Sequence, residues 1–181
     1  NYPEDNLIVL DALTYAGNLN NLKKLIEKNK ISFIKGDISD KSTIYDIFVQ
    51  NKINNVVHFA AESHVDRSIK SPDSFIQTNI IGTFNLIEVF RELKGKNVSE
   101  NNWRFLHVST DEVFGSLDLD EEPFSEETKY DPSSPYSASK AAGDHIIKAY
   151  YRTYGFPGLI TNCCNNYGPF QNKEKLIPMT I

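Results

Sequence analysis

Tyr136 and Lys140 stand four residues apart in a segment with helical periodicity. On a helix this spacing places the phenol and the ammonium on one face. A free phenol has a pKa of about 10 and is a poor base at neutral pH, whereas a nearby cation favours the phenolate. Such a pair could take the proton of a hydroxyl group while hydride leaves the carbinol carbon. The same spacing also fits an ordinary, partly exposed helix face, so it decides little alone.

Three polar residues, Thr110, Asp111 and Glu112, follow the strand-like segment 105–109. Adjacent carboxylates repel each other, so one of them is readily protonated. An acid beside a base is what the removal of water across two carbon atoms requires. The simpler alternative is a solvated turn with Asp111 as a helix cap. Tyr136, on a downstream helix of the same sheet, argues against that alternative.

Apolar runs alternate with amphipathic stretches along the chain, which predicts a parallel sheet covered by helices. The apolar runs predict strands at residues 7–10, 31–34, 56–61, 105–109 and 159–162. Helical spacing predicts helices over residues 19–26, 44–48, 72–90 and 136–154, the third opened by Ser71 as cap and by Pro72. Its aromatic residues Phe75, Phe84 and Phe90 are expected in the core. The predicted fold class is α/β, a doubly wound, Rossmann-like parallel sheet.

Residues able to bind a ligand follow several of the predicted strands. A doubly wound sheet binds its ligand at the carboxyl ends of its strands. We expect one sheet edge to be lined by Asp11, Asp37, 60–63, 110–112 and 165–166.

Simpler roles exist for some of these residues. Asp11 could cap a helix, Asp37 could belong to a plain turn, and the asparagines could bond within a loop. His58 and His107 lie within strand patterns and are expected to be satisfied core residues.

Composition narrows the class of protein. The chain has 181 residues with a net charge of −5, which argues against a nucleic-acid binder, because such proteins normally carry a basic face. Cys163 and Cys164 are sequence neighbours and make a poor disulfide, and no apolar run reaches the roughly 20 residues of a membrane span. We therefore expect a cytoplasmic protein without a nucleic-acid or membrane partner and without a metal site.

Four segments carry a resemblance to a known family: 13–19, 60–68, 109–112 with 136–140, and 162–169. Together they resemble the extended short-chain dehydrogenase/reductases, and among these the dTDP-glucose 4,6-dehydratases. The resemblance runs along essentially the whole chain. It implies a catalytic set consisting of Thr110, Asp111, Glu112, Tyr136 and Lys140.

The resemblance also implies NAD as cofactor and a nucleotide sugar as substrate. An acidic residue at position 11 favours NAD, because it would repel a 2′-phosphate. The implied cofactor-binding residues are Asp11, Ala12, Leu13, Thr14, Asp37, Ile38, Phe59, Ala60, Ala61, Glu62, Ser63, Thr78, Tyr136, Lys140 and Asn166. The implied substrate-binding residues are Ser63, Thr110, Asn165, Lys175 and Leu176.

The implied reaction converts a nucleotide-diphospho-glucose into its 4-keto-6-deoxy sugar and water, for deoxysugar biosynthesis. Tyr136 would take the C4 hydroxyl proton as hydride passes to NAD+, while Lys140 keeps Tyr136 acidic. Thr110 would bond the C4 oxygen. Glu112 would remove the C5 proton, and Asp111 would protonate the departing C6 hydroxyl.

Three alternatives remain: a UDP-sugar dehydratase, an epimerase or decarboxylase on the same scaffold, and a non-enzymatic, truncated nucleotide-binding module. An epimerase or decarboxylase needs no paired acid and base, so the Asp111–Glu112 pair argues against it. We expect residues 1–181 to form a partial NAD-binding and catalytic domain, with 163–181 leading into the substrate-binding part. The first strand with its glycine-rich loop, and most of the substrate domain, are expected outside this sequence. A helix-mediated homodimer is also expected from the resemblance.

Overall fold

The computed structural model describes residues 4–94 and 103–181. These residues form two compact units. One unit contains the chain up to Asp37 together with Asn165–Ile181, and the other contains Ile38–Cys164. The predicted assignment of the whole chain to one partial domain stays a prediction.

The first unit contains a two-stranded parallel sheet. β1 (Ile8–Asp11) pairs with β2 (Ser32–Lys35), and Asp11 stands opposite Lys35. Between them lie a 3₁₀ helix at Leu19–Asn21 and α1 (Lys23–Glu27), where one helix over 19–26 was predicted. The Asn18 side chain caps the 3₁₀ helix by accepting the N–H of Asn20 at 3.1 Å. The unit also contains α7 (Leu176–Thr180) at the carboxyl end of the chain.

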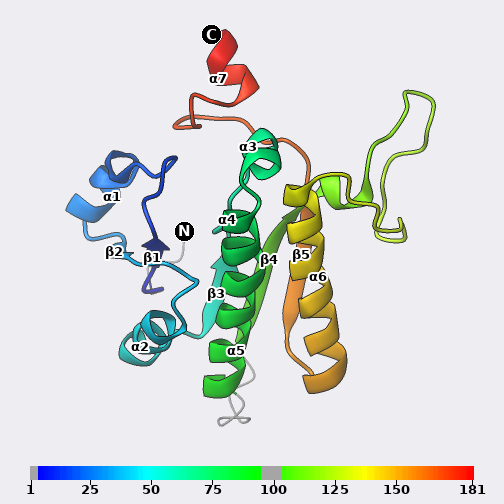
Figure 1. Cartoon of the computed structure of the whole chain (residues 1–181). Coiled ribbons are helices and arrows are strands. Elements are labelled where there is room, and N and C mark those ends of the chain that lie inside the picture. Colours follow the sequence, from blue (N-terminus) through cyan, green and yellow to red (C-terminus); the bar gives the residue numbers. More distant parts are fainter. Residues whose placement is uncertain (1–3, 95–102) are drawn as a thin grey trace. The chain divides into compact units, whose positions relative to one another are not determined.

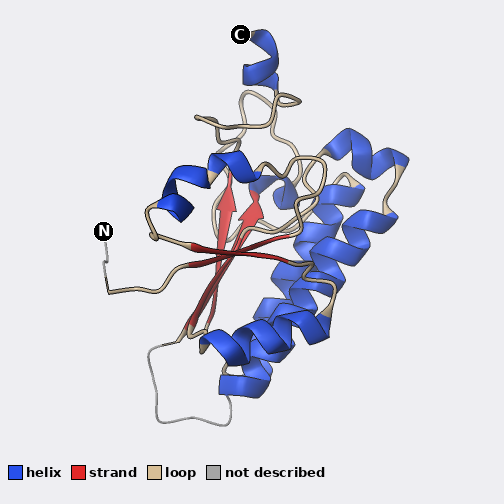
Figure 2. Ribbon diagram, turned by 90° about the vertical axis from the view of Figure 1, so that its left-hand side faces the viewer, coloured by secondary structure: helices blue, strands red, loops and turns tan. Residues whose placement is uncertain are grey.

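The second unit is built on a three-stranded parallel sheet in the order β3 (Asn55–His58), β4 (Arg104–Thr110) and β5 (Gly158–Cys163). The long helices α5 (Thr83–Lys94) and α6 (Pro135–Tyr154) pack on one face of this sheet (Figures 1 and 2). α2 (Lys41–Asn51) packs against α5, and α3 (Val65–Lys70) contacts α6. The parallel strands and the helices that connect them confirm the predicted Rossmann-like α/β class.

The helix predicted over 72–90 is correct in position but not in regularity. It consists of α4 (Asp73–Phe75), a π-helical segment at Ile76–Gly82, and α5. Pro72 occupies the N-cap position without a side-chain cap, so the predicted cap by Ser71 is wrong. Phe75 and Phe90 are buried as predicted, whereas Phe84 is 38% exposed. The wider π turn advances more residues per turn and rotates the buried face away from Phe84.

Aromatic rings fill the core between α5 and the sheet. Phe90 lies 5.9 Å from Phe105 between ring centroids, and Phe105 lies 5.4 Å from Phe156. Phe48 of α2 meets Phe90 edge-on at 6.0 Å. These packed rings fix α5 and α2 against β4. Across the described ranges, no helix has the length and apolar character needed to cross a membrane.

Candidate active site

The carboxyl end of β4 presents the predicted polar triplet. Thr110 ends the strand and caps a 3₁₀ turn at Asp111–Phe114, in which its Oγ1 accepts the N–H of Glu112 at 3.3 Å. Val113 is fully buried and anchors the turn, while Asp111 and Glu112 are half-buried. The helix-cap alternative therefore applies to Thr110 and not to Asp111.

Helix α6 supplies the second half of the site. Ser134 and Ser137 form a reciprocal capping box in which each side chain accepts the other's backbone N–H at 3.0 Å, and Pro135 occupies the first turn. This well-defined start places Tyr136 and Lys140 in the first two turns. Both side chains are buried, with 9% and 3% of their surface exposed.

The phenol of Tyr136 shares its surroundings with the β4 triplet. Burial raises the pKa of Tyr136 to about 12, the carboxylates of Glu112 and Asp111 act in the same direction, and a side-chain hydrogen bond with Thr110 acts against them. The edge of the Phe75 ring also packs on the phenol ring, at 6.3 Å between centroids. The structure thus brings Thr110, Asp111, Glu112 and Tyr136 into one site, as predicted.

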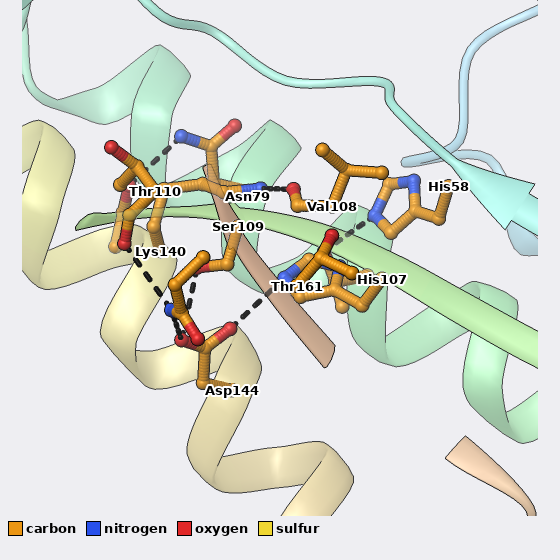
Figure 3. Close-up of polar contacts among 12 residues, drawn as sticks. His58, Asn79, His107, Val108, Ser109, Thr110, Lys140, Asp144 and Thr161 are labelled. Carbon is orange, nitrogen blue, oxygen red and sulfur yellow. Dashed lines mark hydrogen bonds and ion pairs between the residues drawn. The ribbon is translucent and has the colours of Figure 1, made fainter. Parts of the chain in front are cut away.

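Lys140 is placed differently from the prediction. Its Nζ donates to the carbonyl oxygen of Val108 in β4 at 2.8 Å (Figure 3). Burial lowers the pKa of Lys140 to about 8, and the Asp144 carboxylate opposes that shift. Burial and the two carboxylates raise the pKa of Tyr136 in this structure and outweigh any lowering by Lys140, so the tuning of the phenol by Lys140 stays a prediction.

The loop after β3 contains the predicted cofactor residues 59–63. Phe59 is 71% exposed, Ser63 is exposed, and residues 60–62 are half-buried. Burial raises the pKa of the Glu62 carboxyl, with Arg67 acting against that shift. Ile38 is buried, and Thr78 is half-buried within the π-helical segment.

Asn79 is a site residue that the sequence reasoning missed. Its Nδ2 donates to the Glu62 carbonyl at 2.9 Å and to Ser139 Oγ at 2.8 Å, and its Oδ1 accepts the Glu62 N–H at 2.8 Å. Asn79 therefore ties the loop after β3 to the helix that carries Tyr136 and Lys140. A polar residue inside the apolar stripe of the predicted helix was the available signal.

The remaining predicted residues lie in the first unit. At the end of β1, the exposed Asp11 carboxylate accepts the Leu13 N–H at 2.7 Å, and Leu13 has a positive φ of 51°. Asp11 therefore caps a turn and not a helix. Exposed residues at the other predicted positions are Thr14, Asp37, Asn165, Asn166 and Leu176, whereas Ala12 and Lys175 are half-buried. Their binding roles stay predictions.

The chain's residues fit an NAD cofactor at two separate places. Asp11 presents an exposed carboxylate at the carboxyl end of a parallel strand, which suits ribose hydroxyl groups and repels a 2′-phosphate. The loop after β3 offers backbone groups held in place by Asn79. The first place thus offers a hydrogen-bond acceptor for hydroxyl groups, and the second offers a loop whose position is fixed by Asn79.

His58 and His107 are core residues, as predicted. His58 Nε2 lies 2.9 Å from Thr83 Oγ1, whereas neither ring nitrogen of the fully buried His107 has a hydrogen-bond partner. The expectation of a satisfied histidine is therefore correct for His58 and wrong for His107. Burial lowers the pKa of His58 to about 3 and that of His107 to about 2, and Lys140 contributes to both shifts.

Comparison with known proteins places this geometry in a family. The family described as GDP-mannose 4,6 dehydratase matches residues 1–181. The chain belongs to this family.

Two curated members named dTDP-glucose 4,6-dehydratase show how close the similarity is. The protein from Salmonella typhimurium is 50% identical over 98% of this chain and 52% of its own length. That from Escherichia coli is 47% identical over 100% of this chain and 53% of its own length. The chain thus spans about half the length of the curated relatives it matches.

Solved structures agree with this placement. The dTDP-glucose 4,6-dehydratase DesIV from Streptomyces venezuelae, solved with NAD bound, has a TM-score of 0.88 and 45% identity over 98% of this chain and 52% of that chain. A UDP-glucose 4-epimerase from Thermotoga maritima has a TM-score of 0.81 but only 26% identity, over 95% of this chain and 52% of that chain. The epimerase is thus the more distant of the two in sequence.

Proposed function

We propose that the whole protein is an NAD-dependent nucleotide-sugar 4,6-dehydratase that acts on dTDP-glucose and is a hydro-lyase. The observation that carries the proposal is the shared site of the Tyr136 phenol, Thr110 and the two carboxylates Asp111 and Glu112. This site combines a candidate alcohol base with a candidate acid–base pair. The two relatives named dTDP-glucose 4,6-dehydratase support the choice of substrate.

The first half of the reaction would use Tyr136, Thr110 and Lys140. NAD, when bound, supplies a hydride acceptor that can also return the hydride. Tyr136 takes the proton of the C4 hydroxyl, and Thr110, which is hydrogen-bonded to the phenol, holds the C4 oxygen. Lys140 is fixed to the Val108 carbonyl and supplies a buried cation on the same helix.

The second half would use the acid–base pair. Once C4 is a ketone, the proton on C5 becomes acidic, and Glu112 removes it as C6 loses its hydroxyl. Asp111 gives a proton to that leaving hydroxyl, so that water departs and a C5=C6 double bond remains. The hydride taken from C4 would then return to C6, and the proton held by Glu112 to C5, which gives the 4-keto-6-deoxy sugar. The two carboxyl groups are neighbours on one 3₁₀ turn, so one can give a proton while the other removes one.

The remaining assignments belong to the same proposal. NAD would be held by Tyr136 and Lys140 together with residues 11–14, Asp37, Ile38, the loop 59–63, Thr78 and Asn166. The substrate would contact Ser63, Asn165, Lys175 and Leu176. We further propose a cytoplasmic homodimer that serves deoxysugar biosynthesis.

The rival functions are less well supported. A UDP-sugar dehydratase would use the same catalytic residues, and only the recognised base would differ. An epimerase or decarboxylase would need no acid–base pair, so it would not explain the presence of Asp111 and Glu112 together. A purely nucleotide-binding module would have no use for a buried phenol beside two carboxylates.

Product analysis with the whole protein tests the proposal. Incubation with dTDP-glucose and catalytic NAD+ should give a 4-keto-6-deoxy sugar without net NADH, and Tyr136→Phe should abolish the product. A parallel assay with UDP-glucose measures whether the enzyme distinguishes uracil from thymine in the nucleotide of the substrate. Stoichiometric NADH release, or a C4 epimer as product, would sink the proposal.

A further inference from the structure

Asp144 is a fully buried carboxylate one helical turn beyond Lys140 on α6. Its Oδ2 accepts three hydrogen bonds: from Ser109 Oγ at 2.9 Å, from the Tyr130 hydroxyl at 3.2 Å and from Asn162 Nδ2 at 3.3 Å. The donors come from β4, from the segment before α6 and from β5. Figure 3 shows the contact of Asp144 with Ser109 and its position on the helix that also carries Lys140.

The second oxygen of Asp144 lies in a different environment. Oδ1 has no hydrogen-bond partner, and Nε2 of the buried His107 lies 3.4 Å from it. Because the pKa of His107 is lowered to about 2, chiefly by burial, this imidazole is neutral near pH 7 and supplies no counter-charge. On the outer side, exposed Lys148 donates to the Tyr130 hydroxyl at 2.9 Å. Lys140, by contrast, is a buried cation on the same helix.

Burying a carboxylate without a nearby cation costs folding free energy, and so does burying an ammonium without a nearby anion. The i, i+4 spacing on α6 places Asp144 and Lys140 on one face, so each can offset the burial of the other. Burial raises the pKa of Asp144, whereas Ser109, Lys140, Tyr130 and Asn162 all act to lower it. His58 also faces this region, with its ring 5.1 Å from that of His107, and burial keeps it neutral.

We propose that Asp144 is a positioning residue: its carboxylate keeps Lys140 protonated at neutral pH and so maintains the ammonium contact with the Val108 carbonyl. This inference rests on the proposed function, because Lys140 belongs to the proposed catalytic set. The same carboxylate links the end of β4, through Ser109, to β5 through Asn162. Asn162 in turn donates to the Thr110 carbonyl at 3.2 Å. Asp144 therefore influences the proposed active site through Lys140 and Thr110, and it is not itself proposed to contact substrate or cofactor.

The test measures the protonation of Lys140 directly in the whole protein. Competitive acetylation with acetic anhydride across the neutral to alkaline range, read by mass spectrometry, follows the neutral amine. Exposed Lys52 serves as the internal reference, and the rate at the alkaline plateau corrects for accessibility. Asp144→Asn should raise the corrected labelling of Lys140 at pH 7 about five- to tenfold. A loss of about 1–3 units from a pKa of about 8 raises the neutral amine from roughly a tenth to between half and nearly all of the population.

Tyr130→Phe is the matched control, because it removes one hydrogen bond to Asp144 but keeps the carboxylate. It should leave Lys140 labelling within twofold of wild type, and Asp144→Glu should restore part of the wild-type value. Unchanged labelling in Asp144→Asn, or an equal change in Tyr130→Phe, would overturn the inference. The labelling experiment needs no turnover, so it tests the role of Asp144 alone. Product analysis with the wild-type protein tests the proposed function separately.

If Asp144→Asn fails to fold, the reciprocal variant supplies the answer. Charge coupling acts equally on both partners, so Lys140→Met should raise the pKa of the Asp144 carboxyl. Nuclear magnetic resonance of protein labelled with ¹³C-aspartate would follow that titration. An Asp144 signal that titrates as in the wild type would refute the coupling.

Discussion

Lys140 donates its hydrogen bond to the carbonyl oxygen of Val108, 2.8 Å away, although Tyr136 lies only one turn earlier on the same helix. Although Tyr136 and Lys140 share one helix face, their polar ends therefore contact different groups. The Lys140 ammonium bonds a backbone carbonyl of β4, whereas the Tyr136 phenol is influenced by Thr110, Glu112 and Asp111.

Lys140→Met should accordingly leave the titration of Tyr136 nearly unchanged in the protein without cofactor. The phenol pKa of about 12 is set first by burial and next by Glu112. The phenolate absorbance difference between this variant and Lys140→Met/Tyr136→Phe isolates Tyr136. A rise of the pKa by a unit or more would show that Lys140 tunes the phenol after all.

Glu112→Gln should lower the pKa of Tyr136. The Glu112 carboxylate disfavours a second negative charge nearby, so its removal favours phenolate formation, by up to about 1 unit. The same absorbance titration measures the shift. Glu126→Gln in the exposed loop is the control and should leave Tyr136 unmoved. A higher pKa in Glu112→Gln would contradict this electrostatic account.

Asn79→Ala should loosen the link between the loop after β3 and α6. The substitution removes three hydrogen bonds and leaves the Glu62 N–H and carbonyl without this partner. Leaving such groups unsatisfied costs about 2–3 kcal/mol of unfolding free energy. Urea denaturation measures the loss, and NAD titration should show weaker binding. Gln77→Ala, an exposed neighbour, should change neither quantity; equal effects of both variants would refute the role of Asn79.

Gly158→Ala should destabilise the second unit through a steric clash. An added Cβ would lie 2.5 Å from Ile147 Cγ2 and 3.2 Å from Phe156 Cδ1, where α6 packs on the start of β5. Overpacking of this kind typically costs about 1–3 kcal/mol. Gly168→Ala is the matched control, because its Cβ would meet nothing within 4 Å. Thermal unfolding compares the two; equal melting temperatures would show that the β5 start relaxes freely.

The sequence predicted those features that depend on local periodicity. Apolar spacing predicted a strand at 105–109, found at Arg104–Thr110, and a helix at 136–154, found at Pro135–Tyr154. It also marked the helix face of Ile44, Ile47 and Phe48, which is buried. These signals lie within a single element and need no knowledge of its neighbours.

The features that sequence reasoning missed depend on contacts between elements. The π-helical segment holds Asn79 against Glu62 and Ser139, residues 17 and 60 positions away. The direction of the Lys140 side chain depends on a carbonyl of β4, 32 residues earlier. The buried Asp144 looks in sequence like any polar position of an amphipathic helix, because its three donors come from three other segments.

His58 gives the fold a predictable sensitivity to acid. Its pKa is lowered to about 3 by burial, with Lys140 acting in the same direction, so the folded state keeps His58 neutral where the unfolded chain is protonated. The stability tied to this neutral ring is complete above 6.5, the ordinary pKa of a histidine in an unfolded chain, and is lost as pH falls toward 3. Over that window each extra proton bound by the unfolded chain lowers the unfolding free energy by about 1.4 kcal/mol per pH unit.

His58→Gln tests this account, because its amide can still bond Thr83 but cannot bind the proton. Its unfolding free energy should therefore fall less steeply below pH 6.5 than that of the wild type. Urea denaturation at a series of pH values measures both slopes, and His145→Gln, an exposed site, should retain the wild-type slope. If His58→Gln and the wild type lose stability in parallel, His58 is protonated in the folded state and the burial argument fails.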